Sequence, residues 1–275
     1  MIIDGHVHPS VYEDAGWART PAPIEKIIEE MNGPFVIDGE ERRVDMSLCQ
    51  PAAWETIYHA ENHGYGFFEQ HSYVIECVRR FPDRIIGCMN LNPRFGVAKG
   101  LTVLEELIST KGFRALKLHA NHHVYRPEAA QKLLNPIFDK ASKLRIPVLI
   151  HTGDTPFSSP AQWAEYIERY REVNVILCHY ATQMISYAYE AVYIAKKNPN
   201  VYLEIGWAPQ SRLREGVITL GDDRLIFGTD TPPNEMSVWI KMVESMMKDP
   251  PLGSSLSREG LRRILGENLK GLLRL

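Results

Sequence analysis

Residues 146–179 read IPVLIHTGDTPFSSPAQWAEYIERYREVNVILCH. Two apolar runs, at 146–151 and 173–179, lie on either side of a segment with helical period at 163–173. Both runs are continuous instead of alternating, which is typical of parallel strands that helices cover on the outside. The stretch therefore predicts a strand–helix–strand unit in which each strand ends in a histidine, His151 and His179.

The same pattern repeats along the chain. Further apolar runs occupy residues 2–4, 43–48, 85–91, 114–119, 200–206 and 224–230, and stretches of helical period lie between them at 73–82, 103–110, 129–144 and 185–199. Eight strands alternating with helices predict an α/β fold of the (β/α)₈ TIM-barrel type, and 275 residues is a normal length for one such barrel. No repeat, charge block or linker interrupts the pattern, so we expect a single domain over residues 1–275.

Two segments fall outside the repeat. Residues 9–42 contain one predicted helix, at 23–31, and are otherwise irregular. We expect this segment to be a long first loop over the barrel mouth. Residues 257–273 predict two short closing helices.

Composition excludes several functional classes. The formal net charge of −3 provides no electrostatic basis for binding nucleic acid or an anionic membrane. No apolar stretch is long enough to cross a bilayer, and the first strand begins too early for a signal peptide. The four cysteines have no CxxC spacing, and three of them lie in apolar runs, so we expect buried free thiols and a cytoplasmic location.

Polar side chains gather at the predicted strand ends. His6 and His8 are separated by one residue, so in an extended strand they project from the same face. The other residues at strand ends are Lys117, His119, His151, His179 and Asp230. Each has an ordinary structural explanation: a surface His-X-His, buried imidazoles bonded to the backbone, or an aspartate in a turn. However, the carboxyl ends of barrel strands meet at one face, and this convergence favours a metal-dependent active site.

The motifs IIDGHVHP, FPDRIIGCMNLNPR, GFRALKLH, IPVLIHTG, VILCHYA, NVYLEI, RLIFGTDTP and ILGENLKGLL occur in this order over residues 2–273. With them the chain resembles the amidohydrolase superfamily, in its amidohydrolase-related (amidohydrolase 2) branch. The resemblance implies one divalent metal ion bound by His6, His8, His151 and Asp230, with His179 beside it. Zn²⁺ is the first choice, although mixed nitrogen and oxygen ligands also suit Mn²⁺, Fe²⁺ or Co²⁺. Asp230 and His179 are the implied catalytic residues, which accept and move protons.

Lys117 has three interpretations. Strand alternation in LeuLysLeu (116–118) directs it into the barrel. By the resemblance, it is either carboxylated and bridges two metals, with His179 on the second, or remains an ammonium group that binds a substrate carboxylate. A third interpretation is a lysine that reaches the barrel rim. The last two together are preferred.

Three further residues are candidates for substrate binding. His119 follows the fourth strand, and Trp207 follows the seventh and could form an apolar pocket wall. Arg94 could pair with an anionic group, although a rim salt bridge explains it equally well.

The sequence favours a hydrolase that cleaves a small-molecule amide, lactone or ester bond through a metal-activated water. The main alternative is a metal-dependent decarboxylase or hydratase of an aromatic or unsaturated carboxylic acid. The chain is short for the larger decarboxylases, which favours the hydrolase. A non-catalytic metal-binding barrel would be expected to lack a ligand, and none is missing. The expected partner is a small-molecule substrate, and a homodimer is left open.

Overall fold

The computed structural model describes residues 1–11, 21–51, 71–181 and 184–275. Eight parallel strands form one sheet in the order β1-β4-β5-β6-β7-β8-β9-β10. They are β1 (Ile3–Val7), β4 (Met46–Cys49), β5 (Ile85–Asn90), β6 (Phe113–Leu118), β7 (Val148–Ile150), β8 (Val175–Leu177), β9 (Val201–Glu204) and β10 (Leu225–Ile226). Each coincides with a predicted apolar run, and the predicted barrel architecture is confirmed.

Backbone hydrogen bonds close the barrel between its first and last strands. Gly5 N donates to Phe227 O, Asp230 N to His6 O and His8 N to Thr231 O, each at 2.9 Å. The buried carboxyl group of Asp4 adds a link across the seam, because it accepts hydrogen bonds from the Thr229 backbone N–H at 3.0 Å and from the Thr229 hydroxyl at 2.5 Å. His6 and Asp230 are therefore neighbours across the seam of the barrel.

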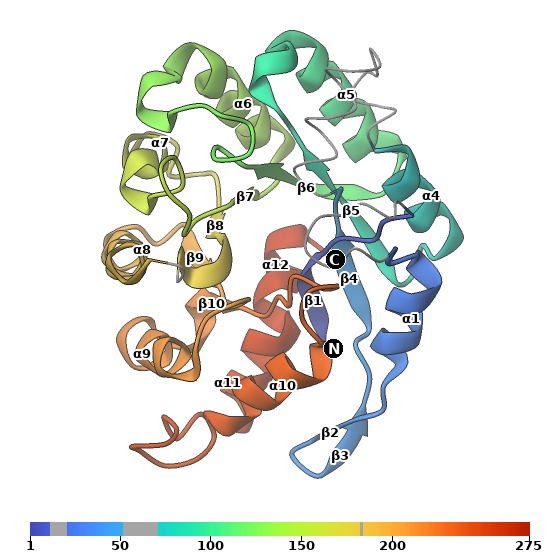
Figure 1. Ribbon diagram of the computed structural model, residues 1–275, viewed down its shortest axis with the longest axis vertical. Coiled ribbons are helices and arrows are strands. Elements are labelled where there is room, and N and C mark those ends of the chain that lie inside the picture. The colour runs from blue at the N-terminus through green and yellow to red at the C-terminus, as the bar shows by residue number, and fades with distance from the viewer. Residues whose placement is uncertain (12–20, 52–70, 182–183) are drawn as a thin grey trace.

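Helices surround the strands, as Figure 1 shows in a view along the barrel axis. They are α4 (Ser72–Arg80), α5 (Val97–Thr110), α6 (Gln131–Leu144), α7 (Ala164–Arg169), α8 (Ile185–Lys197), α9 (Gln210–Leu220) and α10 (Met236–Ser245). The sequence did not predict α9 and α10. In α9 the buried residues are only Leu213 and Gly216, so its apolar period is weak. No helix of the described residues is long and apolar enough to cross a membrane.

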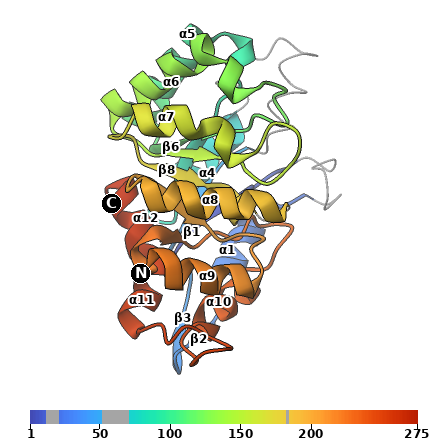
Figure 2. The ribbon, with the colours of Figure 1, turned by 90° about the vertical axis from the view of Figure 1, so that its left-hand side faces the viewer.

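Two apolar cores stabilise the fold. One lies between the strands and the surrounding helices, and the other fills the barrel interior with side chains such as Ile3, Leu48 and Ile176. The predicted closing helices are α11 (Arg258–Arg262) and α12 (Asn268–Leu273), joined by a π-helical turn. Leu269, Leu272 and Leu273 of α12 pack onto the interior core, and Figure 2 shows α12 on the side of the molecule where both termini lie. The tail thus plugs the barrel at the end where β1 begins.

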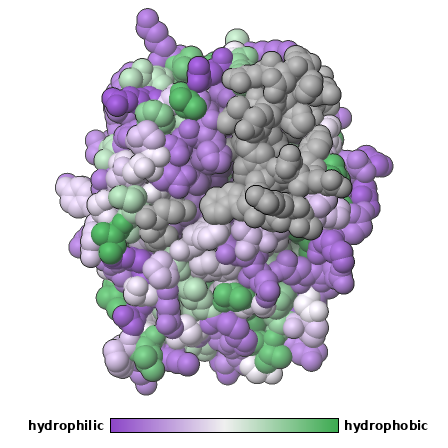
Figure 3. Space-filling model, viewed as in Figure 1, coloured by the Kyte–Doolittle hydropathy of each residue, from purple (hydrophilic) through white to green (hydrophobic). Residues whose placement is uncertain are grey.

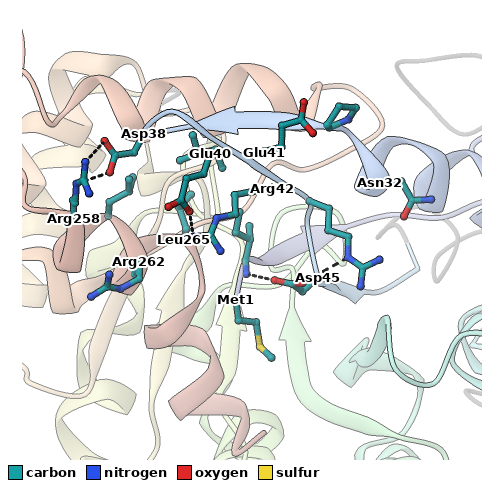
Figure 4. Close-up of a pocket in the computed structure, with 15 residues that line it drawn as sticks. Met1, Asn32, Asp38, Glu40, Glu41, Arg42, Asp45, Arg258, Arg262 and Leu265 are labelled. Carbon is teal, nitrogen blue, oxygen red and sulfur yellow. Dashed lines mark hydrogen bonds and ion pairs between the residues drawn. The ribbon is translucent and has the colours of Figure 1, made fainter.

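The segment over 9–42 differs from its prediction. The predicted helix is present as α1 (Ile24–Asn32), but the irregular part that follows is an antiparallel hairpin of β2 (Phe35–Ile37) and β3 (Glu40–Arg42). The hairpin does not cover the mouth. It borders a hollow of about 510 Å³ beside Met1, the start of β1 and α11, where Arg258 pairs with Asp38 at 2.7 Å (Figure 4). Residues 12–20 lie outside the described part of the chain, so the prediction that the first loop lies over the barrel mouth is not tested there.

Candidate active site

Three side chains converge at the seam of the barrel. Asp230 Oδ1 lies 3.1 Å from His8 Nε2 and 3.4 Å from His6 Nε2. These atoms form a group whose spacing suits a metal ion. The rings of His6 and His8 are 5.0 Å apart, as expected for residues on the same face of a strand. The structure therefore brings together three of the four predicted ligands.

The fourth predicted ligand, His151, lies in an adjoining group. Its Nδ1 is 3.1 Å from His179 Nε2, and its Nε2 is 2.8 Å from Asp154 Oδ2. The His179 ring in turn stacks on His6 at a centroid distance of 4.9 Å. His151 is thus next to the ligand group, but both its nitrogens face other partners, and its role as a ligand stays a prediction.

Three of the residues that follow the strands have a strained backbone. His179, Trp207 and Asp230 have φ values of 62°, 67° and 60°, in the left-handed region that non-glycine residues rarely adopt. Such a conformation costs roughly 1–2 kcal/mol per residue. Strained residues cluster at functional sites, where the surrounding structure must hold them in place.

Burial keeps most of the imidazoles neutral. It lowers the pKa of His6, His119 and His179 well below the usual value, and nearby positive groups, such as Lys117 beside His6, lower it further. Neutral imidazole is the form that binds a metal. For Asp230, burial alone would raise the pKa, but His6, His8 and His179 hold it well below its ordinary range. The site therefore presents neutral rings and a carboxylate.

Lys117 points into the barrel, as strand alternation predicted. Its Nζ lies 3.2 Å from His6 Nε2 and 3.2 Å from Cys178 Sγ. The side chain is buried, which excludes a lysine that reaches the rim. The carboxylated lysine and the ammonium group that binds a substrate carboxylate both stay predictions.

The three candidates for substrate binding lie in different places. His119 is part of the site, because its ring stacks on His151 at 3.7 Å. Trp207 lies beside the ligand group, since its Nε1–H donates to Asp230 Oδ2 at 2.7 Å, and its role as a pocket wall stays a prediction. Arg94 is exposed, and its guanidinium donates to the carbonyl of Val124 at 3.4 Å, with no ion pair to a carboxylate of the described residues. Its pairing with an anionic substrate group stays a prediction. Seen along the barrel axis, the described surface is mainly hydrophilic with scattered hydrophobic side chains (Figure 3).

Two carboxylates of the site were missed by the sequence analysis. Glu204, at the end of β9, is fully buried and lies 3.1 Å from His6 Nδ1. A glutamate inside the apolar run NVYLEIG was the available signal, because unpaired carboxylates are almost never fully buried. Asp154, the partner of His151, had no such signal because aspartate is ordinary in a loop.

All four cysteines are free and buried, as predicted.

Comparisons with known proteins agree with this architecture. The family model described as Amidohydrolase matches residues 3–275. No curated protein matches the chain by sequence.

Several solved structures share the fold over nearly all of both chains. The 5-carboxyvanillate decarboxylase of Novosphingobium aromaticivorans, in complex with manganese, has a TM-score of 0.76 at 11% identity and covers 100% of this chain and 96% of its own. A dihydroxybenzoic acid decarboxylase of Polaromonas sp. JS666, also with bound manganese, has a TM-score of 0.72 at 15% identity, with coverage of 100% and 97%. The 2,6-dihydroxybenzoate decarboxylase of Rhizobium has a TM-score of 0.70 at 13% identity, with coverage of 99% and 98%. At these identities the likeness concerns the fold, whereas the family match spans almost the whole sequence, and the chain therefore belongs to the amidohydrolase family.

Proposed function

We propose that the protein is a metal-dependent lyase that removes CO₂ from a small aromatic or unsaturated carboxylic acid. This was the alternative in the sequence analysis, and it now replaces the hydrolase as the first choice. Three of the structural relatives described above are decarboxylases of aromatic acids, and two of them contain manganese. The family match makes such an enzyme a coherent choice for this chain.

The ligand group fits a divalent ion. The Oδ1 atom of Asp230 lies 3.1 Å from the Nε2 atom of His8 and 3.4 Å from the Nε2 atom of His6. Ligands at about 2.1 Å from one tetrahedral ion would be separated by about 3.4 Å. His6, His8 and Asp230 would hold the ion, and Mn²⁺ takes precedence over the Zn²⁺ first expected because the relatives contain manganese. When bound, the ion would supply positive charge that orients and polarises an anionic substrate.

The hydrogen bond from Trp207 to Asp230 carries the choice between lyase and hydrolase. In a hydrolase, Asp230 must bind the metal through one oxygen and accept a proton from water on the other. Here Oδ1 faces His6 and His8, and Oδ2 accepts the indole N–H at 2.7 Å. Both oxygens of the carboxylate have partners, and the indole N–H lowers the basicity of Oδ2, which weakens Asp230 as a general base. A decarboxylase needs no attacking water, and this arrangement suits it.

His179 is the residue that we assign to proton transfer. Its ring lies beside His6, and its Nε2 shares a hydrogen bond with His151 Nδ1 at 3.1 Å, so a proton can pass between the two rings on its way to the carbon. The carbon that bears the carboxylate gains this proton, its bond to the carboxylate breaks, and the bonding electron pair stays in the ring as CO₂ leaves. Each turnover consumes one proton from solvent. The positive charge of Lys117 favours an anionic substrate over a neutral amide or ester.

Product analysis tests this proposal. The manganese-loaded protein is incubated with hydroxylated benzoic acids labelled with ¹³C at the carboxyl group, in D₂O. We expect release of ¹³CO₂ and deuterium at the vacated carbon, and neither from the His8→Ala variant. A parallel panel of lactones, amides and esters is assayed in H₂¹⁸O. Entry of ¹⁸O into a new carboxylate, without release of CO₂ from the acids, would overturn the lyase in favour of the hydrolase.

A further inference from the structure

A fully buried carboxylate, Glu204, links the two imidazoles that the proposed reaction uses. Its Oε2 lies 3.1 Å from His6 Nδ1 and accepts the backbone N–H of His179 at 2.9 Å. Its Oε1 accepts the backbone N–H of Gly206. A buried carboxylate is costly unless hydrogen bonds satisfy it, and this one has three nitrogen partners. The sequence analysis assigned no role to Glu204.

The chain leaves room for this carboxylate at two glycines. A Cβ atom at Gly206 would come within 2.6 Å of Glu204 Oε1, and one at Gly228 within 2.7 Å. Real Cβ contacts are never this short, so any larger residue would displace the carboxylate. The position of Glu204 is thus determined by the ends of β9 and β10 together.

We infer that Glu204 is a positioning residue that fixes the tautomer of His6 and holds His179 beside it. The inference rests on the proposed metal centre and adds to it a residue that touches neither metal nor substrate. With its Nδ1–H donated to Glu204, His6 must present the lone pair of Nε2. That nitrogen faces Asp230 Oδ1 at 3.4 Å and Lys117 Nζ at 3.2 Å. Glu204 therefore orients the metal-binding nitrogen before any ion arrives.

The same geometry argues against a second metal ion at Glu204. His6, Cys178 and Glu204 also form a group with metal-like spacing. However, a metal there would need His6 Nδ1 and a Cys178 thiolate. Cys178 Sγ already accepts a hydrogen bond from Lys117 Nζ at 3.2 Å, and the two oxygens of Glu204 already accept the backbone N–H groups of His179 and Gly206. Glu204 therefore serves as the hydrogen-bond acceptor of His6 and binds no metal of its own.

Metal affinity and ring protonation test the inference in the full-length chain. Binding of Mn²⁺ is followed through the electron paramagnetic resonance signal of the free ion. We expect about one ion per wild-type chain and a Kd roughly 10–100-fold higher in Glu204→Gln, the usual effect of losing such a partner. In ¹⁵N-histidine spectra of the metal-free protein, assigned with His6→Asn, His6 should show a protonated Nδ1 and a bare Nε2. In Glu204→Gln the two tautomers should mix.

Two further variants sharpen the test. Gly228→Ala crowds the carboxylate without removing it and should weaken Mn²⁺ binding in the same direction, which keeps the test usable if Glu204→Gln does not fold. Glu190→Gln is the matched control. Glu190 lies on α8, and its carboxylate also accepts one hydrogen bond from a backbone N–H and one from a side-chain hydroxyl. It should bind Mn²⁺ like wild type.

The outcomes separate this inference from the proposed function. Wild-type affinity together with an unchanged His6 signal in Glu204→Gln would overturn the positioning role. Two ions in wild type and one in Glu204→Gln would overturn it as well. A wild-type chain that binds no Mn²⁺ would refute the metal centre, whereas the ring spectra would still report on Glu204.

Discussion

At the scale of single residues, burial sets the protonation state in opposite directions for acids and bases. It lowers the pKa of His6 and His179 and raises the pKa of Cys178 to about 12, because in each case the charged form loses its hydration. The same removal of water thus gives neutral imidazoles and protonated thiols in one barrel. Cys178 remains a thiol even though Lys117 lies beside it and acts to lower its pKa.

The thiols provide a direct check at this scale. Burial also raises the pKa of Cys77 to about 12, and all four cysteines are buried. The thiolate is the reactive form, and at pH 8 almost none is present when the pKa lies near 12. We expect Ellman's reagent to label none of the cysteines in the native protein within minutes, and four in guanidinium chloride. A native cysteine labelled as fast as free glutathione would contradict this account of burial.

At the scale of elements, α12 determines how the barrel interior is sealed. Leu269 and Leu272 pack beneath Ile3 and Ile226, so the interior core ends on a helix and not on solvent. Gly5 permits this approach, because a Cβ atom there would lie 3.0 Å from Leu269 Cδ2. The strand that carries His6 therefore rests on the closing helix.

Truncation of this plug should be costly. Leu269→Ala removes a side chain that is 1% exposed and should lower the free energy of unfolding by about 2–5 kcal/mol, through lost burial and a new cavity. Leu275→Ala is the control, because Leu275 is 41% exposed and its loss should cost about 0.5 kcal/mol or less. Urea unfolding followed by circular dichroism measures both variants. Equal losses would mean that α12 does not seal the interior.

At the scale of the whole molecule, the stability of the barrel and the chemistry of its mouth are separable. The two apolar cores lie beneath and around the strands, whereas the ligand group lies where the strands end. However, the candidate ligands differ in how deeply they are buried. His6 is 1% exposed and bonded to Glu204, but His8 is 15% exposed at the rim. His8 is therefore the candidate ligand whose removal should destabilise the fold least.

This division predicts the behaviour of a metal-free barrel. His8→Ala should abolish tight Mn²⁺ binding, whereas its melting temperature should match that of wild type measured in chelator. The added stability of the metal-loaded wild type follows from binding to the native state alone. Elemental analysis and thermal unfolding make the comparison. His122→Ala, outside the ligand group, should retain its metal. Loss of the fold in His8→Ala without metal would contradict the separation.

The order of strands and the convergence of polar residues at their ends could be predicted from the sequence, because both depend on local patterns, whereas the choice of His6, His8 and Asp230 as candidate ligands came from the resemblance to a family. Continuous apolar runs specify buried parallel strands, and the residue after each run then lies at the mouth. Short polar elements could not be predicted from such apolar patterns. The hairpin strand Glu40–Arg42 has no buried residue, and α9 has too few for a clear period.

The partners inside the site required the tertiary structure. Glu204 lies 198 residues from His6, and Trp207 lies 23 residues from Asp230, so no local pattern relates them. Pairing of β9 with β10 brings Trp207 to Asp230, and closure of the barrel between β1 and β10 brings Glu204 to His6. Only then does burial shift the pKa values of His6 and Asp230. The sequence by itself determined which residues reach the mouth. The folded barrel decided which atoms face one another, because hydrogen bonding and desolvation depend on distances that the chain acquires when it closes.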